Sequence, residues 1–119
     1  MKTQVITIGD ELLIGQTADT NAQWMASKLT GHGMEVHRIC SLRDRTEDIV
    51  EALEWAQQHS QVALVTGGLG PTRDDVTRQA IGEFFNVPWQ MNPQVYQRLE
   101  NYLAKRGYAV SQLNREQAK

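Results

Sequence analysis

The sequence predicts an α/β protein, with a mostly parallel sheet covered by helices on both faces. Short runs rich in β-branched residues alternate three times with segments of helical periodicity. The connections between them are short, as in parallel strand–helix–strand units. No internal repeat or low-complexity tract interrupts the 119 residues. We therefore expect a single domain over residues 1–119, because chains of this size rarely divide.

The first predicted strand and helix lie on either side of a polar connection. Residues 5–8 (VITI) are a short β-rich run that ends at Gly9, which we interpret as a buried strand. We expect the connection to be an ordered segment over the sheet edge, held by inward-packing aliphatic side chains at 12–14 (LLI). Thr20 is then the expected N-cap of a helix that reaches about Leu29.

The middle of the chain repeats this order of strand and helix. Residues 35–40 (EVHRIC) alternate in polarity and predict a second strand. Thr46 is the expected N-cap of the next helix, whose first turn carries acidic residues where the helix dipole favours them. Residues 62–66 (VALVT) are almost entirely apolar, which is typical of a central strand covered on both faces.

The last third of the chain predicts two further helices. One of the two aspartates at 74–75 is the expected cap of a helix that reaches Phe85. Residues 87–90 predict a short strand. The dipeptide Asn-Pro at 92–93 opens a second helix, which Gly107 ends.

Composition excludes several classes of function. Twelve basic and 14 acidic residues give a net charge of -2, which provides no electrostatic footprint for nonspecific nucleic-acid binding. The single cysteine, Cys40, forms neither an internal disulfide nor a multi-cysteine zinc site. No apolar run approaches the roughly eighteen residues of a membrane span, and no signal-peptide pattern opens the chain. We expect a cytoplasmic protein without nucleic-acid or membrane partners, with Trp24, Trp55 and Trp89 in the core or at an interface.

Acidic side chains follow each predicted strand. Asp10, Glu11 and Asp19 follow the first strand, Asp44 follows the second, and the aspartates at 74–75 follow the third. Because ligands of open α/β sheets bind beyond the carboxyl ends of the strands, these acids are expected at a shared edge. Hard cations prefer oxygen ligands, so the edge suits metal-assisted chemistry. The alternative is that the same acids are solvated loop residues and helix caps.

The most informative segment is TGGLGPTRDD at residues 66–75. Its small and rigid residues, placed between a buried strand and a helix, bring backbone N–H groups close to a ligand and favour an anion site. It is no Walker A loop, because it has no lysine, and Arg73 stands where a dinucleotide fingerprint has its third glycine. Two carboxylates beside a phosphate would repel it unless a cation bridges them. The alternative is a tight strand-to-helix turn with an aspartate cap.

Three motifs follow one another at characteristic separations: GDELLIGQTADTNAQW at residues 9–24, SLRD at 41–44 and TGGLGPTRDD at 66–75, with NREQA at 114–118 near the end. Together they resemble the amino-terminal domain of the competence/damage-inducible protein CinA family, over essentially the whole chain. The GGLGPT form is that of the CinA branch, whereas related cofactor-biosynthesis enzymes more often read GGTG. The resemblance implies a molybdopterin-binding-like fold, a three-layer α/β/α domain with its ligand site at the glycine-rich loop.

The resemblance also implies an activity, the metal-dependent hydrolysis of ADP-ribose-like nucleoside pyrophosphates. Asp44 and Asp75 match the family's loop aspartates and are the expected catalytic residues. Asp10 and Glu11, together with Asp75, are the expected ligands of a divalent metal ion. The expected phosphate-binding residues come from the glycine-rich loop and the opening motif: Thr66, Gly67, Gly68, Gly70, Thr72 and Asn21.

Two other functions stay open. One is a non-catalytic module that binds a pterin or nucleotide phosphate, in which case molybdopterin is the ligand. The other is an oligomerisation unit, since relatives of this fold commonly assemble as dimers or trimers. Similar domains continue past NREQA into a further strand, so the chain looks truncated at its carboxy terminus. An unpaired sheet edge would then favour self-pairing as a homodimer or homotrimer.

Overall fold

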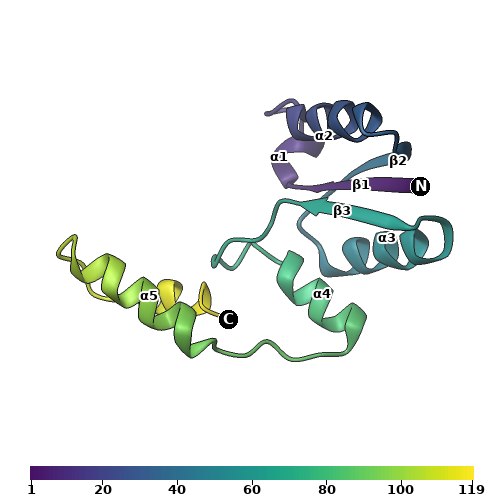
Figure 1. The fold of residues 1–119 in the computed structure, drawn as a ribbon. Coiled ribbons are helices and arrows are strands. Elements are labelled where there is room, and N and C mark those ends of the chain that lie inside the picture. Colours follow the sequence, from purple (N-terminus) through teal and green to yellow (C-terminus); the bar gives the residue numbers. More distant parts are fainter.

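The computed structural model describes all of residues 1–119 and contains three strands and six helices (Figure 1). In chain order the elements are β1 (Lys2–Ile8), α1 (Asp10–Leu13), α2 (Thr20–Gly31), β2 (Glu35–Leu42), α3 (Thr46–His59), β3 (Val62–Thr66), α4 (Thr77–Phe85), α5 (Pro93–Ala104) and α6 (Gln112–Glu116). The predicted strands at 5–8, 35–40 and 62–66 are present, the one at 87–90 is not, and the main predicted helices correspond to α2, α3, α4 and α5.

The sheet is parallel throughout, with β1 between β2 and β3. The central strand is β1, whose residues are buried from Thr3 to Ile8. The prediction that residues 62–66 form the central strand is therefore wrong: β3 is an edge strand, half-buried along most of its length. An apolar sequence indicates that the two faces of a strand are covered. It does not indicate whether the strand pairs with a neighbour on one side or on both sides, so residues 62–66 suit a central or an edge position equally well.

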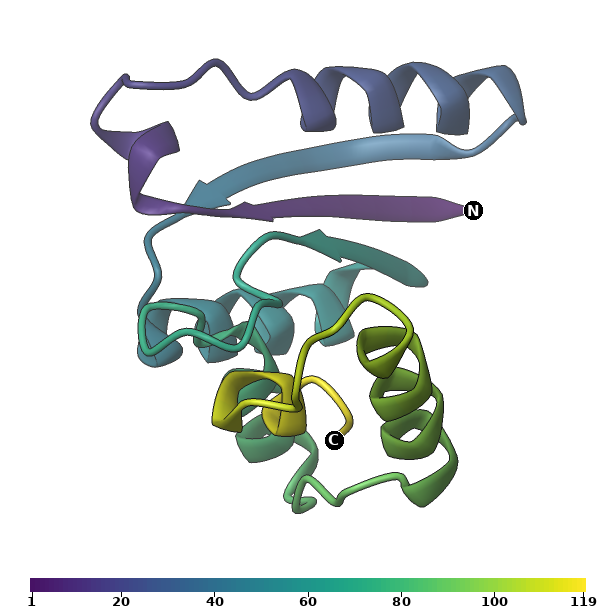
Figure 2. The same cartoon turned by 90° about the vertical axis from the view of Figure 1, so that its left-hand side faces the viewer.

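The layers are those predicted. Helices α1 and α2 lie on one face of the sheet, and α3 and α4 on the other (Figures 1 and 2). On the α3 side, Ile6 and Ile8 of β1 pack against Ile49 and Leu53 of α3 and against Ala80 of α4. Ile49 and Leu53 are four residues apart and so share one face of their helix. The three-layer α/β/α arrangement is confirmed.

The connection after β1 contains a helical turn, α1, that the sequence prediction did not include. The Gly9 N–H donates to the Leu42 carbonyl at 2.9 Å and ties the start of this turn to the end of β2. Leu13 and Ile14 are 42% and 56% exposed, so the predicted inward packing of 12–14 is wrong for these two residues. Successive side chains on a helical turn point about 100° apart, so three in a row do not face the same way.

Two helices begin differently from the prediction. The N-cap of α2 is Asp19, whose carboxylate accepts from the Ala22 N–H at 3.1 Å, and Thr20 is already helical. A carboxylate is a stronger acceptor than a hydroxyl and is favoured by the helix dipole. The N-cap of α3 is Arg45, without a side-chain hydrogen bond, and Thr46 is its first helical residue.

The region around α4 departs most from the prediction. Val76 is the N-cap of α4, and no side chain caps it, so the expected aspartate cap at 74–75 is wrong. No strand forms at 87–90. After α4, Asn86 takes a left-handed conformation with φ 54°, and the Val87 N–H returns to the Gly82 carbonyl at 2.9 Å. This turn leads the chain away from the sheet, where it finds no strand to pair with.

The carboxy-terminal helices stand apart from the sheet (Figures 1 and 2). α5 begins as predicted, with Asn92 as an N-cap that accepts from the N–H groups of residues 94 and 95, but it has no buried residue. A capping box between Ser111 and Asn114 fixes the start of α6. The radius of gyration is 16.5 Å, against about 13.5 Å expected for a compact chain of this length.

Candidate functional site

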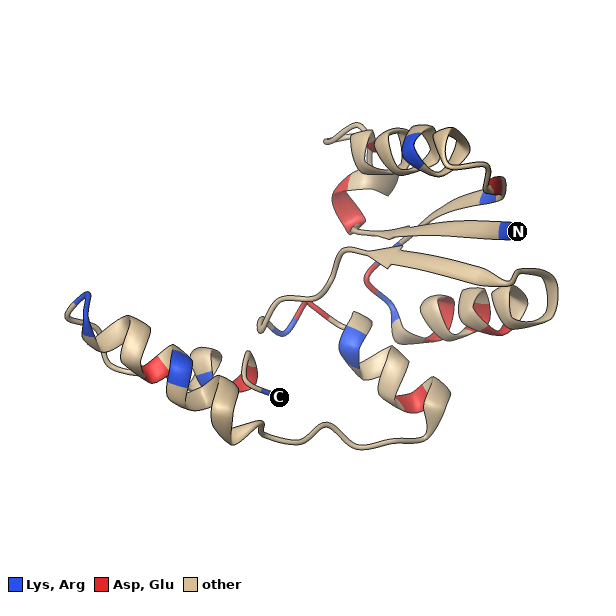
Figure 3. Ribbon diagram, in the orientation of Figure 1, with Lys and Arg blue, Asp and Glu red and all other residues tan.

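The loops after β1 and β2 are held together at the carboxyl edge of the sheet. The Asp10 N–H donates to the Asp44 carboxylate, and the Asp44 N–H donates to the Asp10 carboxylate, both at 3.0 Å. Figure 3 shows acidic positions in α1, in the loop after β2 and in the loop before α4, all near this edge. Acidic residues from three loops thus lie near one edge of the sheet, as predicted.

The glycine-rich loop after β3 has a conformation that requires glycine. Gly67 and Gly68 have φ of 96° and 64°, a region that other residues rarely adopt. The hydroxyl of Thr77 donates to the Gly67 carbonyl at 2.7 Å, and the Thr77 N–H donates to the Gly68 carbonyl at 3.2 Å. Thr77 is fully buried beneath the loop. The sequence alone does not point to Thr77, because a threonine at the start of a helix gives no signal of its distant contacts.

The loop presents unpaired backbone donors. The N–H groups of Gly68, Leu69 and Gly70 donate to no acceptor within the chain. Consecutive free amides close to the start of a helix are a favourable site for an anion such as phosphate. Gly68 and Gly70 are among the predicted phosphate-binding residues, and these free amides are what such a role needs.

Each of these two glycines lies against an aspartate. A Cβ added to Gly68 would lie 3.3 Å from the Asp44 carboxylate, and a Cβ added to Gly70 would lie 2.6 Å from that of Asp75. The Asp75 carboxylate also accepts from the N–H of Thr72 at 3.1 Å and from the Thr72 hydroxyl. The Thr72 side chain is therefore engaged by Asp75 rather than free for a phosphate. The loop is flanked by both predicted catalytic aspartates.

The electrostatics of Asp44 reflect this crowding. Its pKa is raised above the ordinary aspartate value, first by burial and then by the negative charges of Asp10, Glu11 and Asp75, against the lowering effect of its hydrogen bond from Asp10. The charged form of this carboxylate is therefore disfavoured by its neighbours. A bound cation would relieve that repulsion.

Asp19 belongs to a different environment. Its half-buried carboxylate accepts from the hydroxyls of Thr7 and Ser41, the latter at 2.9 Å, as well as from the N–H of Ala22. Burial alone would raise the pKa of Asp19, but these three hydrogen bonds outweigh it and lower the pKa below its ordinary value. Asp19 is thus a structural link between β1, β2 and α2, and its hydrogen bonds leave it little room for metal binding.

The donor set suits a cation held jointly with a substrate. No three side chains of the His, Cys, Asp or Glu type converge into a group that could hold a metal ion by themselves. One oxygen of each aspartate at 10 and 44 already accepts a backbone hydrogen bond. Mg²⁺ is commonly bound by one or two carboxylates together with substrate phosphates and water, without a dedicated protein cage. One or two of the carboxylates of Asp10, Glu11 and Asp75 would fit such a site shared with a substrate.

Two cavities lie beside the glycine-rich loop. The smaller, of about 160 Å³, lies at the strand ends, where Thr66, Gly67 and the predicted residue Asn21 contribute to its lining. The larger, of about 690 Å³, is lined by residues 70–72 and Asp75 of the loop, and by α4 and residues 86–89 on the other side. No residue lines both cavities. No sequence motif pointed to the larger cavity.

A family described as a probable molybdopterin binding domain matches residues 4–118. The chain belongs to the molybdopterin-binding domain family. It is 43% identical over 110 residues to a CinA-like protein of Salinibacter ruber and 35% identical over 118 residues to a putative competence-damage inducible protein of Oceanobacillus iheyensis. These matches include 92% and 99% of this chain, and the predicted CinA resemblance is confirmed. The chain spans only 27% and 28% of the length of these two relatives.

Solved structures agree with the fold. A CinA protein from Thermoplasma acidophilum is 30% identical and has a TM-score of 0.84, over 97% of this chain and 66% of that one. A molybdopterin biosynthesis enzyme MoaB from Thermus thermophilus is 20% identical with a TM-score of 0.65, over 99% and 70% of the two chains, and supports the fold alone. No helix is long and apolar enough to cross a membrane.

Proposed function

We propose that this domain hydrolyses a nucleoside pyrophosphate of the ADP-ribose type with the help of a divalent cation. The observation that carries the proposal is the stretch of three free backbone amides, Gly68 to Gly70, between the carboxylates of Asp44 and Asp75. The amides supply a cradle for phosphate oxygens. The carboxylates supply what a cation and an attacking water need.

The roles of the residues follow from their positions. The amides of Gly68 and Gly70 bind the pyrophosphate oxygens, and Thr77 fixes the loop that presents them. Asp44 orients the attacking water and accepts its proton, a role that suits a carboxylate which lies against Gly68 of the amide stretch. The water oxygen bonds to one phosphorus as the bridging P–O bond breaks, which yields two phosphate monoesters. A divalent cation, when bound, neutralises charge on the phosphates.

The cation would enter together with the substrate. Asp10, Glu11 and Asp75 surround Asp44 closely enough to raise its pKa, yet they form no closed ligand set. A cation that brings its own phosphate ligands completes its coordination shell at such a site. We therefore expect Mg²⁺ to bind weakly to the protein alone and tightly with a pyrophosphate present. Isothermal titration of Mg²⁺ with and without a non-hydrolysable pyrophosphate analogue measures this difference.

The test of the reaction is product release from ADP-ribose with and without Mg²⁺, followed by chromatography. The expected products are AMP and ribose 5-phosphate, formed only with the cation. Asp75→Asn is expected to abolish turnover while the far-UV circular dichroism stays unchanged. Asp74→Asn is the matched control, because Asp74 is the exposed neighbour of Asp75. Unchanged turnover in a folded Asp75→Asn protein would falsify the assignment.

A second candidate function is a module that binds a pterin or nucleotide phosphate without turnover. The family description favours it, since it names molybdopterin binding and no hydrolysis. The same free amides serve either function. A ligand that raises the unfolding temperature of the protein, while no product forms over long incubation with Mg²⁺, is the result expected for this candidate.

We place either activity in the cytoplasm. Cys40 is a free, half-buried thiol, as is usual in proteins of a reducing compartment. Fractionation of cells that express the protein with an epitope tag, probed by immunoblotting, tests this location.

A further inference from the structure

The two cavities beside the glycine-rich loop differ in size and in chemistry. The larger has a volume of about 690 Å³, within the range of about 300–1,000 Å³ typical of small-molecule sites, while the smaller has about 160 Å³. Gly67 lines the smaller one and Gly70 the larger, so the loop residues between them separate the two cavities along the chain. Three residues of chain span at most about 11 Å. The free amides of Gly68 and Leu69 thus lie along the chain between one residue of each cavity.

The larger cavity carries an aromatic ring that is held in place and still open to a ligand. Trp89 is 44% exposed and lines this cavity. Its Nε1–H donates to the Arg78 carbonyl at 2.7 Å, and the Arg78 guanidinium lies 4.8 Å from the ring centroid. Gly82 allows the close approach, because a Cβ there would meet Trp89 Nε1 at 3.0 Å. The guanidinium covers one face of the indole, so a nucleobase would stack on the other face, as bases commonly stack on aromatic side chains.

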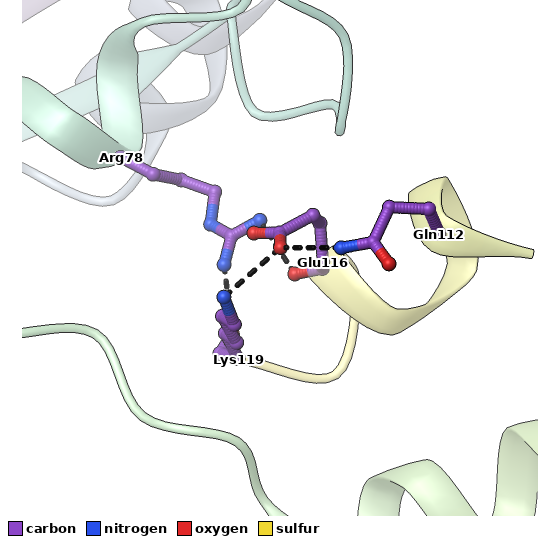
Figure 4. Close-up of polar contacts among 4 residues, drawn as sticks. All are labelled: Arg78, Gln112, Glu116 and Lys119. Carbon is purple, nitrogen blue, oxygen red and sulfur yellow. Dashed lines mark hydrogen bonds and ion pairs between the residues drawn. The ribbon is translucent and has the colours of Figure 1, made fainter.

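The wall of this cavity opposite the loop is formed by Arg78 and by the last residues of α6 and beyond. Arg78 donates from Nη1 to the Glu116 carbonyl and from Nη2 to the Lys119 carbonyl, both at 3.0 Å. The Lys119 ammonium pairs with the Glu116 carboxylate at 2.9 Å, and Gln112 reaches the same carboxylate (Figure 4). Glu116 and Lys119 both line the cavity. These contacts order the wall opposite the loop and hold Arg78 over the indole.

The larger cavity also has amide groups that suit the edge of a base. Gln79 and Asn86 line it, both exposed, and each offers a donor and an acceptor. The smaller cavity has no aromatic residue. It is lined by hydroxyl and amide groups that suit the hydroxyls of a sugar, among them Thr17, Thr20 and Asn21.

We propose that the substrate binds in one orientation, with its nucleoside in the larger cavity against Trp89, its pyrophosphate on the Gly68–Gly70 amides and its second sugar in the smaller cavity. The inference rests on the proposed function, since it assumes a pyrophosphate on the loop. It adds the position of each half and the residue that recognises the base. It also selects nucleoside substrates over sugar pyrophosphates that carry no base.

The test uses the two expected products as separate ligands, one for the nucleoside half of the substrate and one for its second sugar. Titrations with AMP and with ribose 5-phosphate are followed in the ¹H–¹⁵N NMR spectrum of the protein, in which each of the three tryptophans gives an indole N–H signal. Single Trp→Leu variants assign the signals. AMP is expected to shift the Trp89 indole signal, and ribose 5-phosphate is expected to leave it in place.

Affinity measurements complete the test. Trp89→Leu is expected to raise the Kd of AMP about tenfold, the order of loss for one stacking contact, and to leave the Kd of ribose 5-phosphate unchanged. Trp24→Leu is the matched control, because Trp24 is 63% exposed on α2 and lines neither cavity. The indole signal keeps the test decisive if Trp89→Leu does not fold.

Each outcome decides one question. An unmoved Trp89 signal at a saturating AMP concentration overturns the orientation, as does the absence of AMP binding. Neither result touches the proposed hydrolysis, which is measured separately with ADP-ribose. Conversely, absence of hydrolysis with a shifted Trp89 signal removes the catalytic proposal and leaves a nucleotide site with the orientation stated here.

Discussion

Asp10 and Asp44 bond each other reciprocally, each carboxylate accepting from the other's backbone N–H at 3.0 Å across 34 residues of chain. The pairing fixes the start of α1 against the loop after β2, and it points two acidic side chains at one place. Backbone amides hold these carboxylates without cancelling their charges. The charged form of the Asp44 carboxylate carries an electrostatic cost, which comes first from burial and then from the negative charges of Asp10, Glu11 and Asp75, and which the hydrogen bond from the Asp10 N–H offsets only in part.

That cost predicts an unusual pH dependence. The pKa of Asp44 in the folded protein lies above its ordinary value, so the folded state keeps this proton to higher pH than the unfolded state does. The contribution of Asp44 to stability therefore falls as pH rises through this window. We expect Asp44→Asn to be at least as stable as the natural protein at neutral pH, although it is inactive. Urea unfolding at neutral pH and below the ordinary aspartate pKa checks this, and a large loss of stability at neutral pH would contradict it.

Asp19 predicts the opposite dependence. Its pKa in the folded protein is lowered, so its stabilising contribution is fully present above the ordinary aspartate value and is lost as pH falls through the lowered value. Asp19→Asn is expected to destabilise the protein at neutral pH, with a difference that shrinks in acid. The same urea series measures it. A difference between the two proteins that is independent of pH would show that the carboxylate charge is not what Thr7 and Ser41 stabilise.

Removal of the Thr77 hydroxyl is expected to lower stability even when the volume of the side chain is kept. Thr77→Val keeps the volume and removes the hydroxyl that donates to the Gly67 carbonyl. We expect a loss of about 1–3 kcal/mol in the free energy of unfolding, because a half-buried carbonyl is left without that donor. Phosphate affinity should fall as well, since the loop loses its support. Thr77→Ser, which keeps the hydroxyl, is the control, and equal behaviour of the two variants would count against this role.

Substitution of Gly68 is expected to lower stability and binding because of the atoms that surround it, and not only because of its left-handed backbone conformation. Gly68→Ala places a Cβ against Thr77 and Asp44 at φ 64°, and we expect a cost of about 1–3 kcal/mol together with loss of phosphate binding. Gly33→Ala is the matched control, because Gly33 has φ 76° with nothing nearby. It should cost about 1 kcal/mol and leave binding intact. Scanning calorimetry measures the stability of both variants, and titration calorimetry measures their affinity for inorganic phosphate. Unchanged binding in Gly68→Ala would contradict a phosphate site on the loop amides.

The free edge of β3 predicts self-association. The Gln61 N–H bonds to the Lys2 carbonyl at 2.9 Å, so strand alternation directs the main-chain groups of Leu64 outward. β3 carries no charge and no proline, the usual protection of an edge, whereas β2 carries Glu35 and Arg38. We expect dimers in sedimentation velocity, reduced by Ala63→Lys and unaffected by Ile39→Lys on β2. A monomer at all accessible concentrations would refute this expectation.

Local chemistry determined much of this protein from sequence alone. The β-rich runs at 5–8 and 62–66 became strands, and Asn92 became an N-cap, because propensities and turn preferences act over a few neighbouring residues. The glycines of the loop after β3 indicated an irregular turn for the same reason, and Gly67 with its φ of 96° needs glycine there. Acids at successive strand ends predicted a shared edge, because parallel strands end on the same side.

Tertiary structure decided the rest. Both 5–8 and 62–66 look like buried strands, and only pairing across the sheet made β1 central and β3 an edge. The reciprocal bonds of Asp10 and Asp44, and the hydroxyl of Thr77 beneath the loop, join residues whose relation no local pattern records. The cavity beside Trp89 is lined by the glycine-rich loop, α4 and the end of the chain, which are far apart in sequence. Interactions between neighbouring residues determine which segments become helices and strands. Contacts between distant residues determine how these elements are arranged, and the candidate site is formed by residues that only this arrangement brings together.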